Sequence, residues 1–223
     1  MKKLTSITLA IAVIMAFSIS CTAIENANKT QKGAGLGVAG GALIGGLIGG
    51  DIGGALIGAA IGGAAGGLIG KSMDKQADKI EEAVPGAEVK RVGEGIQVVF
   101  DDKSGVTFAL NSAELTGTAK ENLNAISEVF VEFPDTILMI EGHTDDTGEE
   151  AYNMTLSKKR AQSVADYFKN KGISGNRFTV KGFGETAPRF PNDSDANRAK
   201  NRRVEIGVAA NDKMIQDAKA QAN

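Results

Sequence analysis

Two short segments in the C-terminal half of the chain carry side chains of opposite charge that could bind one ligand. The first, residues 142–145 with the sequence GHTD, follows an apolar run that indicates a buried strand. In the second, a predicted helix places Asn153, Leu156 and Arg160 on one face. Ligands of open α/β sheets tend to bind at the carboxyl ends of strands. Asp145 could therefore take an ammonium group and Arg160 a carboxylate, which fits a zwitterionic ligand; a structural salt bridge between the two remains the alternative.

The spacing of these two residues sets a condition on the structure. If the helix begins at Gly148, Arg160 lies about 18 Å along it, at a rise of 1.5 Å per residue. Asp145 and Arg160 can then share a ligand only if the loop between strand and helix folds back over the helix face.

The composition argues against several classes of function. A net charge of -2 over 223 residues gives no sign of nucleic-acid binding, and no zinc-finger spacing or aromatic-basic motif is present. The single Cys excludes an intramolecular disulfide, and one Cys with one His excludes a zinc site built from such residues. No nucleophile elbow accompanies His143, which we interpret as a structural turn residue. We therefore expect no enzyme, no metal and no cofactor.

The N-terminus has the pattern of a secretory signal peptide. Two lysines precede the apolar run at residues 4–17, and small residues lead to Cys21. A Cys at this point resembles a lipoprotein cleavage site, although Ser18 stands where Leu is usual. The resemblance implies a signal peptide at 1–20, a lipidated linker at 21–32 and attachment of lipid at Cys21. Thr22 is not the Asp that retains many lipoproteins in the inner membrane, so we expect the outer membrane. A signal-anchor helix is the alternative.

Residues 33–70 contain 17 of the 29 glycines, in two rows with a period of four. The phase slips by one residue at Gly49 and Gly50, beside Asp51. This period places each row on one helix face, as in the small-xxx-small packing of membrane helices. The pattern predicts a membrane-embedded helical hairpin, with a possible role in homo-oligomers; a flexible linker is the alternative.

The rest of the chain shows alternating strand and helix patterns. Strands are predicted at residues 88–92, 96–100, 106–110, 137–140, 177–181 and 203–208. A charged linker helix is predicted within residues 71–87, and two longer helices begin at capping boxes, Thr118 with Glu121 and Thr147 with Glu150. The order predicts an α+β fold, a two-layer α/β sandwich with two main helices on a mixed sheet. The folded domain spans 88–210, and a polar tail occupies 211–223.

Five motifs of this domain resemble the OmpA-like peptidoglycan-binding domain. The resemblance covers about 110 residues in the expected order, and its motifs are NSAEL at 111–115, GHTDDTG at 142–148, NxxLSxxRAxxV at 153–164, GFGE at 182–185 and NRRVE at 201–205. With the lipoprotein Cys and the glycine tract, nearly the whole chain resembles glycine-zipper OmpA-family lipoproteins of the outer membrane.

The resemblance implies a partner and a set of site residues. In that family an Asp and an Arg hold the amino and carboxylate groups of diaminopimelate in the peptidoglycan stem peptide; here these are Asp145 and Arg160. The remaining matching positions are Asn153, Leu156, Asn111, Thr144 and Arg202. Asn111 is often Asp in the family, and Arg202 is either a ligand contact or a structural ion-pair partner.

Together these features predict a non-catalytic tether, lipid-anchored in the outer membrane, whose periplasmic domain binds peptidoglycan. A stator-like membrane protein, with Asp51 as the ion-carrying carboxylate, is the alternative from another class. An enzyme that acts on peptidoglycan would need a nucleophile with its base or a pair of acids, and the sequence offers neither.

Overall fold

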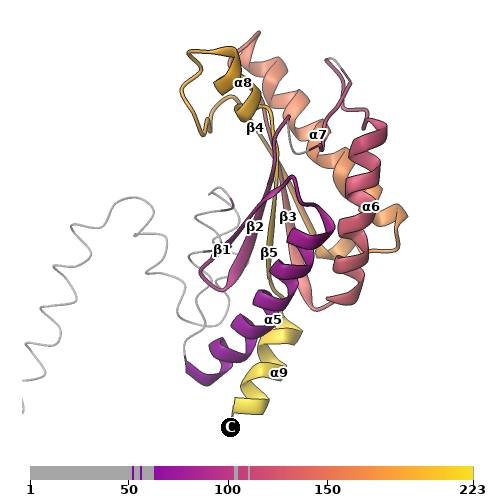
Figure 1. Cartoon of the computed structure of the whole chain (residues 1–223), viewed down its shortest axis with the longest axis vertical. Coiled ribbons are helices and arrows are strands. Elements are labelled where there is room, and N and C mark those ends of the chain that lie inside the picture. The colour runs from indigo at the N-terminus through magenta and orange to yellow at the C-terminus, as the bar shows by residue number, and fades with distance from the viewer. Residues whose placement is uncertain (1–51, 53–55, 57–62, 103–104, 110, 223) are drawn as a thin grey trace, which may run out of the picture.

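A computed structural model describes residues 52, 56, 63–102, 105–109 and 111–222. Figure 1 shows a sheet packed against helices in the C-terminal part of the chain. The elements, in chain order, are α5 (Gly63–Ala83), β1 (Glu88–Val92), β2 (Gly95–Phe100), α6 (Gly117–Glu132), β3 (Thr136–His143), α7 (Glu150–Asn170), the 3-10 turn η1 (Gly175–Arg177), β4 (Phe178–Gly184), α8 (Asp195–Asn201), β5 (Val204–Ala210) and α9 (Asp212–Ala222).

The five strands form one mixed sheet in the order β1-β2-β5-β3-β4. β3 and β4 run parallel, with α7 as the crossover between them, and the other neighbouring pairs are antiparallel. This confirms the predicted α+β class with helices on a mixed sheet. The apolar run at 137–140 lies inside β3, between β5 and β4, where Leu138, Met139 and Ile140 are all buried.

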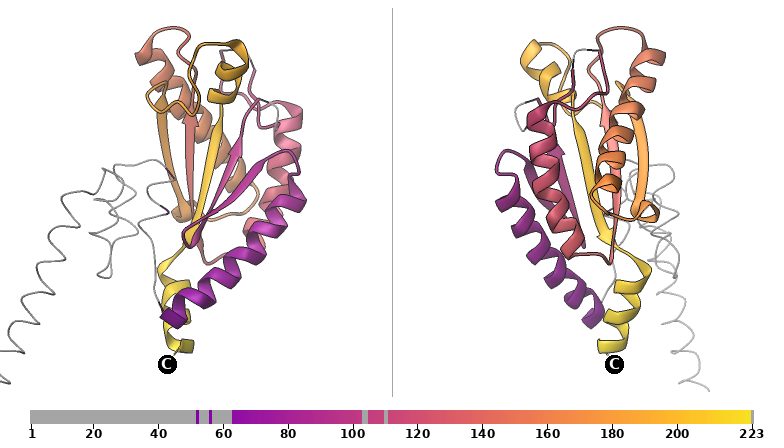
Figure 2. Two further views of the ribbon diagram at one scale, coloured as in Figure 1. Left: turned by 60° about the vertical axis from the view of Figure 1, so that its left-hand side comes forward. Right: turned by 90° about the vertical axis from the view of Figure 1, so that its right-hand side faces the viewer.

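Helices α5, α6 and α7 cover one face of this sheet, called the inner face below (Figure 2). Alternate strand residues point toward them, because successive side chains of a strand face opposite sides. One core therefore joins the strand residues Ile96, Phe100 and Ile206 to apolar residues of all three helices, such as Phe130 of α6 and Phe168 of α7. The rings of the last two pack edge to face, with centroids 5.3 Å apart.

Both predicted capping boxes are wrong in detail. The side chain of Thr116, two residues before the expected cap, accepts the N–H of Ala119 and begins α6. α7 begins at Glu150 after the cap residue Glu149, whose side chain makes no capping hydrogen bond. Thr147 lies two residues before this cap, and its N–H donates to the side chain of Asp145. The predicted strand at 106–110 is reduced to one bridge, between Phe108 and Leu115.

Two expected boundaries also differ from the structure. The linker helix expected within 71–87 is α5, which already includes residues 63–70 of the glycine tract; Ala65 and Ile69 are buried in the same core as Met73 and Ile80. The expected polar tail at 211–223 contains α9, which packs along α5 and buries Ala218. Both helices have an apolar side, and burying it in the main core stabilises them as parts of the domain.

Most of the predicted hairpin at 33–70, together with the signal peptide and Cys21, lies outside the residues that the structure describes. Among those that it does describe, no helix is both long and apolar enough to cross a membrane. Ile52 and Leu56 belong to the tract, and both are fully buried on the outer face of the sheet, opposite the helices.

Candidate functional site

A cavity of about 520 Å³ opens at the carboxyl end of β3, where the sequence places its GHTD motif. All seven residues predicted for the binding site line this cavity. The lining residues are Asp102, Val106, Phe108, Ala109, Asn111, His143, Thr144, Asp145, Thr147, Tyr152, Asn153, Leu156, Arg160, Arg202 and Arg203. The structure thus brings together residues from the loop before α6, the end of β3, the first turns of α7 and the start of β5.

Glycines on β3 and β4 allow α7 to lie close enough to form this cavity. A Cβ on Gly142 would collide with the backbone carbonyl of Ser157, and one on Gly182 would lie 2.5 Å from the N of Lys158. Gly184 has a φ of +53°, and a Cβ there would lie 2.9 Å from the N of Met154. The glycines of the GHTD and GFGE motifs therefore seat the helix that carries Asn153, Leu156 and Arg160.

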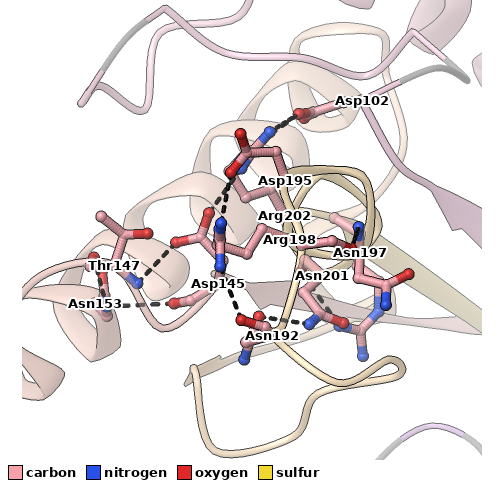
Figure 3. A network of polar contacts seen from close by, with 12 residues as sticks. Asp102, Asp145, Thr147, Asn153, Asn192, Asp195, Asn197, Arg198, Asn201 and Arg202 are labelled. Atoms are coloured by element: carbon pink, nitrogen blue, oxygen red, sulfur yellow. Dashed lines mark hydrogen bonds and ion pairs between the residues drawn. The ribbon is translucent and has the colours of Figure 1, made fainter.

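Asp145 is 7% exposed and is held by two hydrogen-bond donors (Figure 3). Its Oδ1 accepts the N–H of Thr147 at 3.0 Å, and its Oδ2 accepts a guanidinium N–H of Arg202 at 2.7 Å. Burial alone would raise the pKa of this carboxyl, but the hydrogen bonds from Arg202 and Thr147 outweigh it and hold the pKa below its ordinary value. Asp145 is therefore an anion at neutral pH.

The side chain of Asn153 folds the loop after β3 back over the start of α7. Its Nδ2 lies 3.4 Å from the backbone O of Asp145 and 3.1 Å from that of Thr147, and it also donates to Glu185 at 2.7 Å. This meets the condition set by the helix length, because Asp145 and Arg160 now line the same cavity.

Arg160 is half-buried and is oriented by two groups that the charge pattern did not reveal. Its Nε donates to the backbone O of Ser112 at 3.0 Å, and its guanidinium lies over the ring of Phe108, with Cζ 5.0 Å from the centroid. Within the described part of the chain, its two Nη atoms have no hydrogen-bond partner, so they are free to bind a ligand. Burial lowers the pKa of this guanidinium, but an arginine stays charged in proteins.

Arg202 makes the ion pair that was one of its two expected roles, and it also lines the cavity. Its guanidinium bridges Asp145 and Asp102, donating to Asp102 from both Nε at 3.0 Å and Nη2 at 2.5 Å. The alternative of a salt bridge between Asp145 and Arg160 does not hold, since Asp145 pairs with Arg202 instead. Asn201, fully buried at the end of α8, fixes residues 189–192 through four hydrogen bonds and so holds the backbone before Arg202 (Figure 3).

Thr144 and His143 are buried at the cavity floor with polar atoms that lack partners. The Oγ1 of Thr144 and both ring nitrogens of His143 make no hydrogen bond within the described residues. Burial lowers the pKa of His143 well below its ordinary value, and nearby Arg203 and Arg189 lower it further, so the ring is neutral. His143 is the last residue of β3 rather than part of a turn, and its ring stacks on Phe183 with centroids 5.2 Å apart.

Asn111 and Leu156 complete the predicted set. Asn111 has a φ of +50°, a left-handed conformation that Asn tolerates better than most residues, and its backbone O accepts the hydroxyl of Tyr152 at 3.3 Å. Leu156 is buried against the cavity. The sequence analysis missed Asp102, Phe108 and Tyr152, because each lies outside the motifs or at a position where only the fold shows what it faces.

No cluster of His, Cys, Asp and Glu suited to a metal ion occurs among residues 63–102, 105–109 and 111–222. The site therefore offers charge and hydrogen bonds but no group of three metal ligands in this part of the chain.

Comparison with protein families identifies two segments. Residues 107–202 match the OmpA family, and residues 1–74 match the YMGG-like Gly-zipper. The first match contains every predicted site residue from Asn111 to Arg202, and the second contains Cys21 and the whole of the predicted hairpin.

Individual proteins agree with these matches over the C-terminal part. The chain is 38% identical to "Probable lipoprotein YiaD" of Escherichia coli over 124 residues, 56% of each chain, and 35% identical to "Peptidoglycan-binding protein ArfA" of Mycobacterium tuberculosis over 129 residues, 57% of this chain and 40% of that protein. Thus the chain spans about half the length of these relatives. A crystal structure described as a MotB-like protein from Desulfovibrio vulgaris superposes with a TM-score of 0.59 and 28% identity, over 65% of this chain and 95% of that one.

Proposed function

We propose that the chain is a non-catalytic tether between the outer membrane and peptidoglycan, because its segments match the OmpA family and the YMGG-like Gly-zipper. The observation that carries the proposal is that Asp145 and Arg160, which carry opposite charges, line one cavity. A relative over this domain has peptidoglycan binding in its name. The two charges, separate and of opposite sign, suit a ligand that carries both an ammonium and a carboxylate.

We propose that this ligand is the free zwitterionic end of diaminopimelate in the stem peptide. Its carboxylate would accept hydrogen bonds from the two Nη atoms of Arg160, whose Nε is already committed to Ser112. Its ammonium would bind Asp145. A carboxylate has about four lone-pair sites and Asp145 uses two, for Thr147 and Arg202, so an ammonium can bind without breaking either contact.

The remaining polar groups of the cavity support the same orientation. The buried Oγ1 of Thr144 has no partner in the described chain, and a ligand hydrogen bond would remove the cost of leaving it unpaired. Asn111 would contribute a neutral hydrogen bond where a carboxylate would add charge. Arg202 would act mainly by keeping Asp145 ionised. Asn153 would act mainly by holding the loop that carries Asp145.

We propose that Cys21 supplies the membrane attachment. It is the only Cys of the chain and follows a basic, apolar and small-residue segment. A relative over the C-terminal domain carries the name lipoprotein. The protein would be lipid-anchored in the outer membrane with its domain in the periplasm, and copies could associate through the glycine zipper.

A stator-like protein remains the second candidate, favoured by the structural likeness to a MotB-like protein. Both candidates would use the same domain to bind the wall, so that domain does not distinguish them. They differ at Asp51, which only the stator needs: Asp51→Asn would abolish ion-driven activity in a stator and leave a tether unaffected.

Co-sedimentation of the full chain with purified diaminopimelate-type peptidoglycan tests the binding proposal. A charge-assisted hydrogen bond contributes about 1.5–3 kcal/mol, so Asp145→Ala and Arg160→Ala should each weaken binding by roughly ten-fold to a hundred-fold. Lys158→Ala, on the same helix but outside the cavity, is the matched control and should bind normally. Peptidoglycan with lysine in place of diaminopimelate lacks the extra carboxylate. The unchanged chain should therefore bind it no more tightly than the Arg160→Ala variant binds diaminopimelate-type peptidoglycan. Folded Asp145→Ala and Arg160→Ala proteins that bind as well as the unchanged chain would refute the site.

A further inference from the structure

The outer face of the sheet is covered by two residues of the glycine tract. Ile52 and Leu56, four positions apart and both with helical backbone, are 0% exposed. They form a small core of their own with Met139 of β3 and Ala209 of β5, separate from the main core on the inner face. Val92 and Ile137 pack at its edge.

Glycines of the sheet form the surface that receives these two side chains. At Gly207 of β5, an added Cβ would lie 2.8 Å from a Cγ of Ile52. At Gly95 of β2, an added Cβ would collide with the end of the Leu56 side chain. Any larger residue at either position would fill the space that the tract residue occupies. We call these two positions the glycine sockets.

A backbone hydrogen bond fixes the same segment to the sheet. The N–H of Ile52 donates to Oε2 of Glu141 at 3.1 Å, across 89 residues of sequence, and Glu141 is only 2% exposed. Glu141 is on β3 and faces the same side as Met139, because the two are separated by one residue. Two apolar contacts and one polar contact therefore join this part of the tract to the outer face.

The next described residues after Leu56 also belong to the domain. Helix α5 begins at Gly63, within the same glycine row, and buries Ala65 and Ile69 in the main core. Within the second glycine row, residues 50–70, the described residues Ile52 and Leu56 and the first two turns of α5 thus all pack against the domain.

From these contacts we infer that the second glycine row is a docking segment of the periplasmic domain and not one arm of a membrane hairpin. The occupant of the glycine sockets is this row of the same chain. Ile52 and Leu56 cannot be buried in the sheet and in lipid at once, so docking leaves only the first row, residues 33–49, available to a membrane or to a second copy. Docking also shortens the free chain between Cys21 and the domain, which limits how far the domain reaches from its anchor. The inference does not depend on peptidoglycan binding.

A cysteine reporter in membranes that contain the full chain separates docking from membrane insertion. Leu56→Cys should be protected from a small maleimide in either case. Adding Gly207→Leu fills one socket and should raise the labelling rate at least ten-fold if the segment docks there. A membrane-buried Cys would stay protected, because no change on the sheet would alter its surroundings, and that result would overturn the inference. Gly175→Leu is the matched control, since an added Cβ there meets only the flexible Lys169 at 3.6 Å.

A second variant guards against loss of the fold in Gly207→Leu. Ile52→Asp acts from the tract side and leaves the sheet unchanged, so it should also expose Cys at position 56 while the circular dichroism of the domain stays the same. Continued protection in this folded variant would contradict docking. Labelling is measured in excess of the parent chain, whose only Cys is Cys21.

Oxidative cross-linking then identifies the occupant. Leu56→Cys combined with Gly95→Cys should form a disulfide within one chain, seen as loss of both thiols without a dimer band. A dimer band would show that a second copy fills the sockets, which would overturn the assignment to the same chain. With neither product, the docking itself would be refuted; Leu56→Cys with Gly175→Cys provides the background.

Discussion

Glycines lie on both faces of the same sheet, but they are in contact with different kinds of atoms. On the inner face, Gly142 and Gly182 meet the backbone of α7, which has no alternative position while the helix is intact. On the outer face, Gly207 meets the ends of the side chains of Ile52 and Met139. Gly95 faces the end of Leu56 and, at 2.8 Å, the backbone O of Val208.

This difference indicates two uses of one residue type. The contacts between the inner glycines and the backbone of α7 fix the distance between this helix and the sheet. They therefore also fix the position of Arg160 relative to Asp145. The contacts between the outer glycines and the ends of side chains are specific. They can also be broken without unfolding either the sheet or the segment that carries Ile52 and Leu56. The inner glycines thus build a rigid site, and the outer glycines provide a surface on which a segment can dock.

The largest effect is expected at the inner face. Gly142→Ala would place a Cβ against the carbonyl of Ser157, so either α7 or β3 must move. We expect a loss of about 3 kcal/mol in the free energy of unfolding, at the upper end for overpacking. Urea denaturation followed by circular dichroism measures it. Gly175→Ala should change stability by no more than about 0.5 kcal/mol, and equal stabilities for the two variants would refute the distinction between backbone and side-chain contacts.

A smaller effect on stability, with a clear effect on binding, is expected at Gly184. Its φ of +53° costs an L-residue about 1–2 kcal/mol, and a Cβ would press on the N of Met154, beside Asn153. Gly184→Ala should therefore displace the start of α7 and weaken peptidoglycan binding about ten-fold, or about 1.4 kcal/mol. Co-sedimentation at a temperature where the variant is fully folded measures this. Unchanged binding would mean that the inner glycines serve stability alone.

Sequence patterns were sufficient for the class of fold because the relevant signals are local. The period of apolar residues in α6 and the apolar run of β3 both reflect burial of one element at a time. The first capping box was predicted wrongly because Thr116 and Thr118 are equally suitable by type. The second was predicted wrongly because α7 begins at Glu150, two residues after the expected start. Which residue caps a helix depends on the path of the preceding loop.

The site was predictable in part for a similar reason. Motifs gave Asp145 and Arg160, but the pairing of Arg202 with Asp145 crosses 57 residues of sequence. The ring of Phe108 under Arg160 depends on how the loop before α6 passes over α7. The glycine sockets are hidden for the same reason, because a glycine shows that space is needed but not which side chain will fill it.

A moderate effect on stability, with none on binding, is expected at the outer face. Gly207→Ala adds a Cβ that Ile52 and Met139 can avoid by small shifts, so we expect a loss of about 1 kcal/mol. Ile52→Ala in the same chain should remove most of that cost, because the smaller side chain leaves room. The double-mutant cycle should therefore give a coupling energy of about 0.5–1 kcal/mol. Additive changes would mean that Ile52 does not occupy this socket.

The smallest effect concerns the charges of the inner-face site. Asp145 has a lowered pKa, so it contributes as an anion at ordinary pH, and binding that depends on it is lost only as the pH falls through this lowered pKa. Arg202→Ala removes one of the hydrogen bonds that oppose burial, so the pKa of Asp145 should rise and the acid limit of binding should move to higher pH. Co-sedimentation between about pH 3 and pH 7 measures the two profiles against the same peptidoglycan. The ligand carboxylate titrates alike in both, so a difference between the profiles reports Asp145. Identical profiles would show that Arg202 does not hold Asp145 in its charged form. The ion pairs of Arg202 with Asp145 and Asp102 would then have no role in binding.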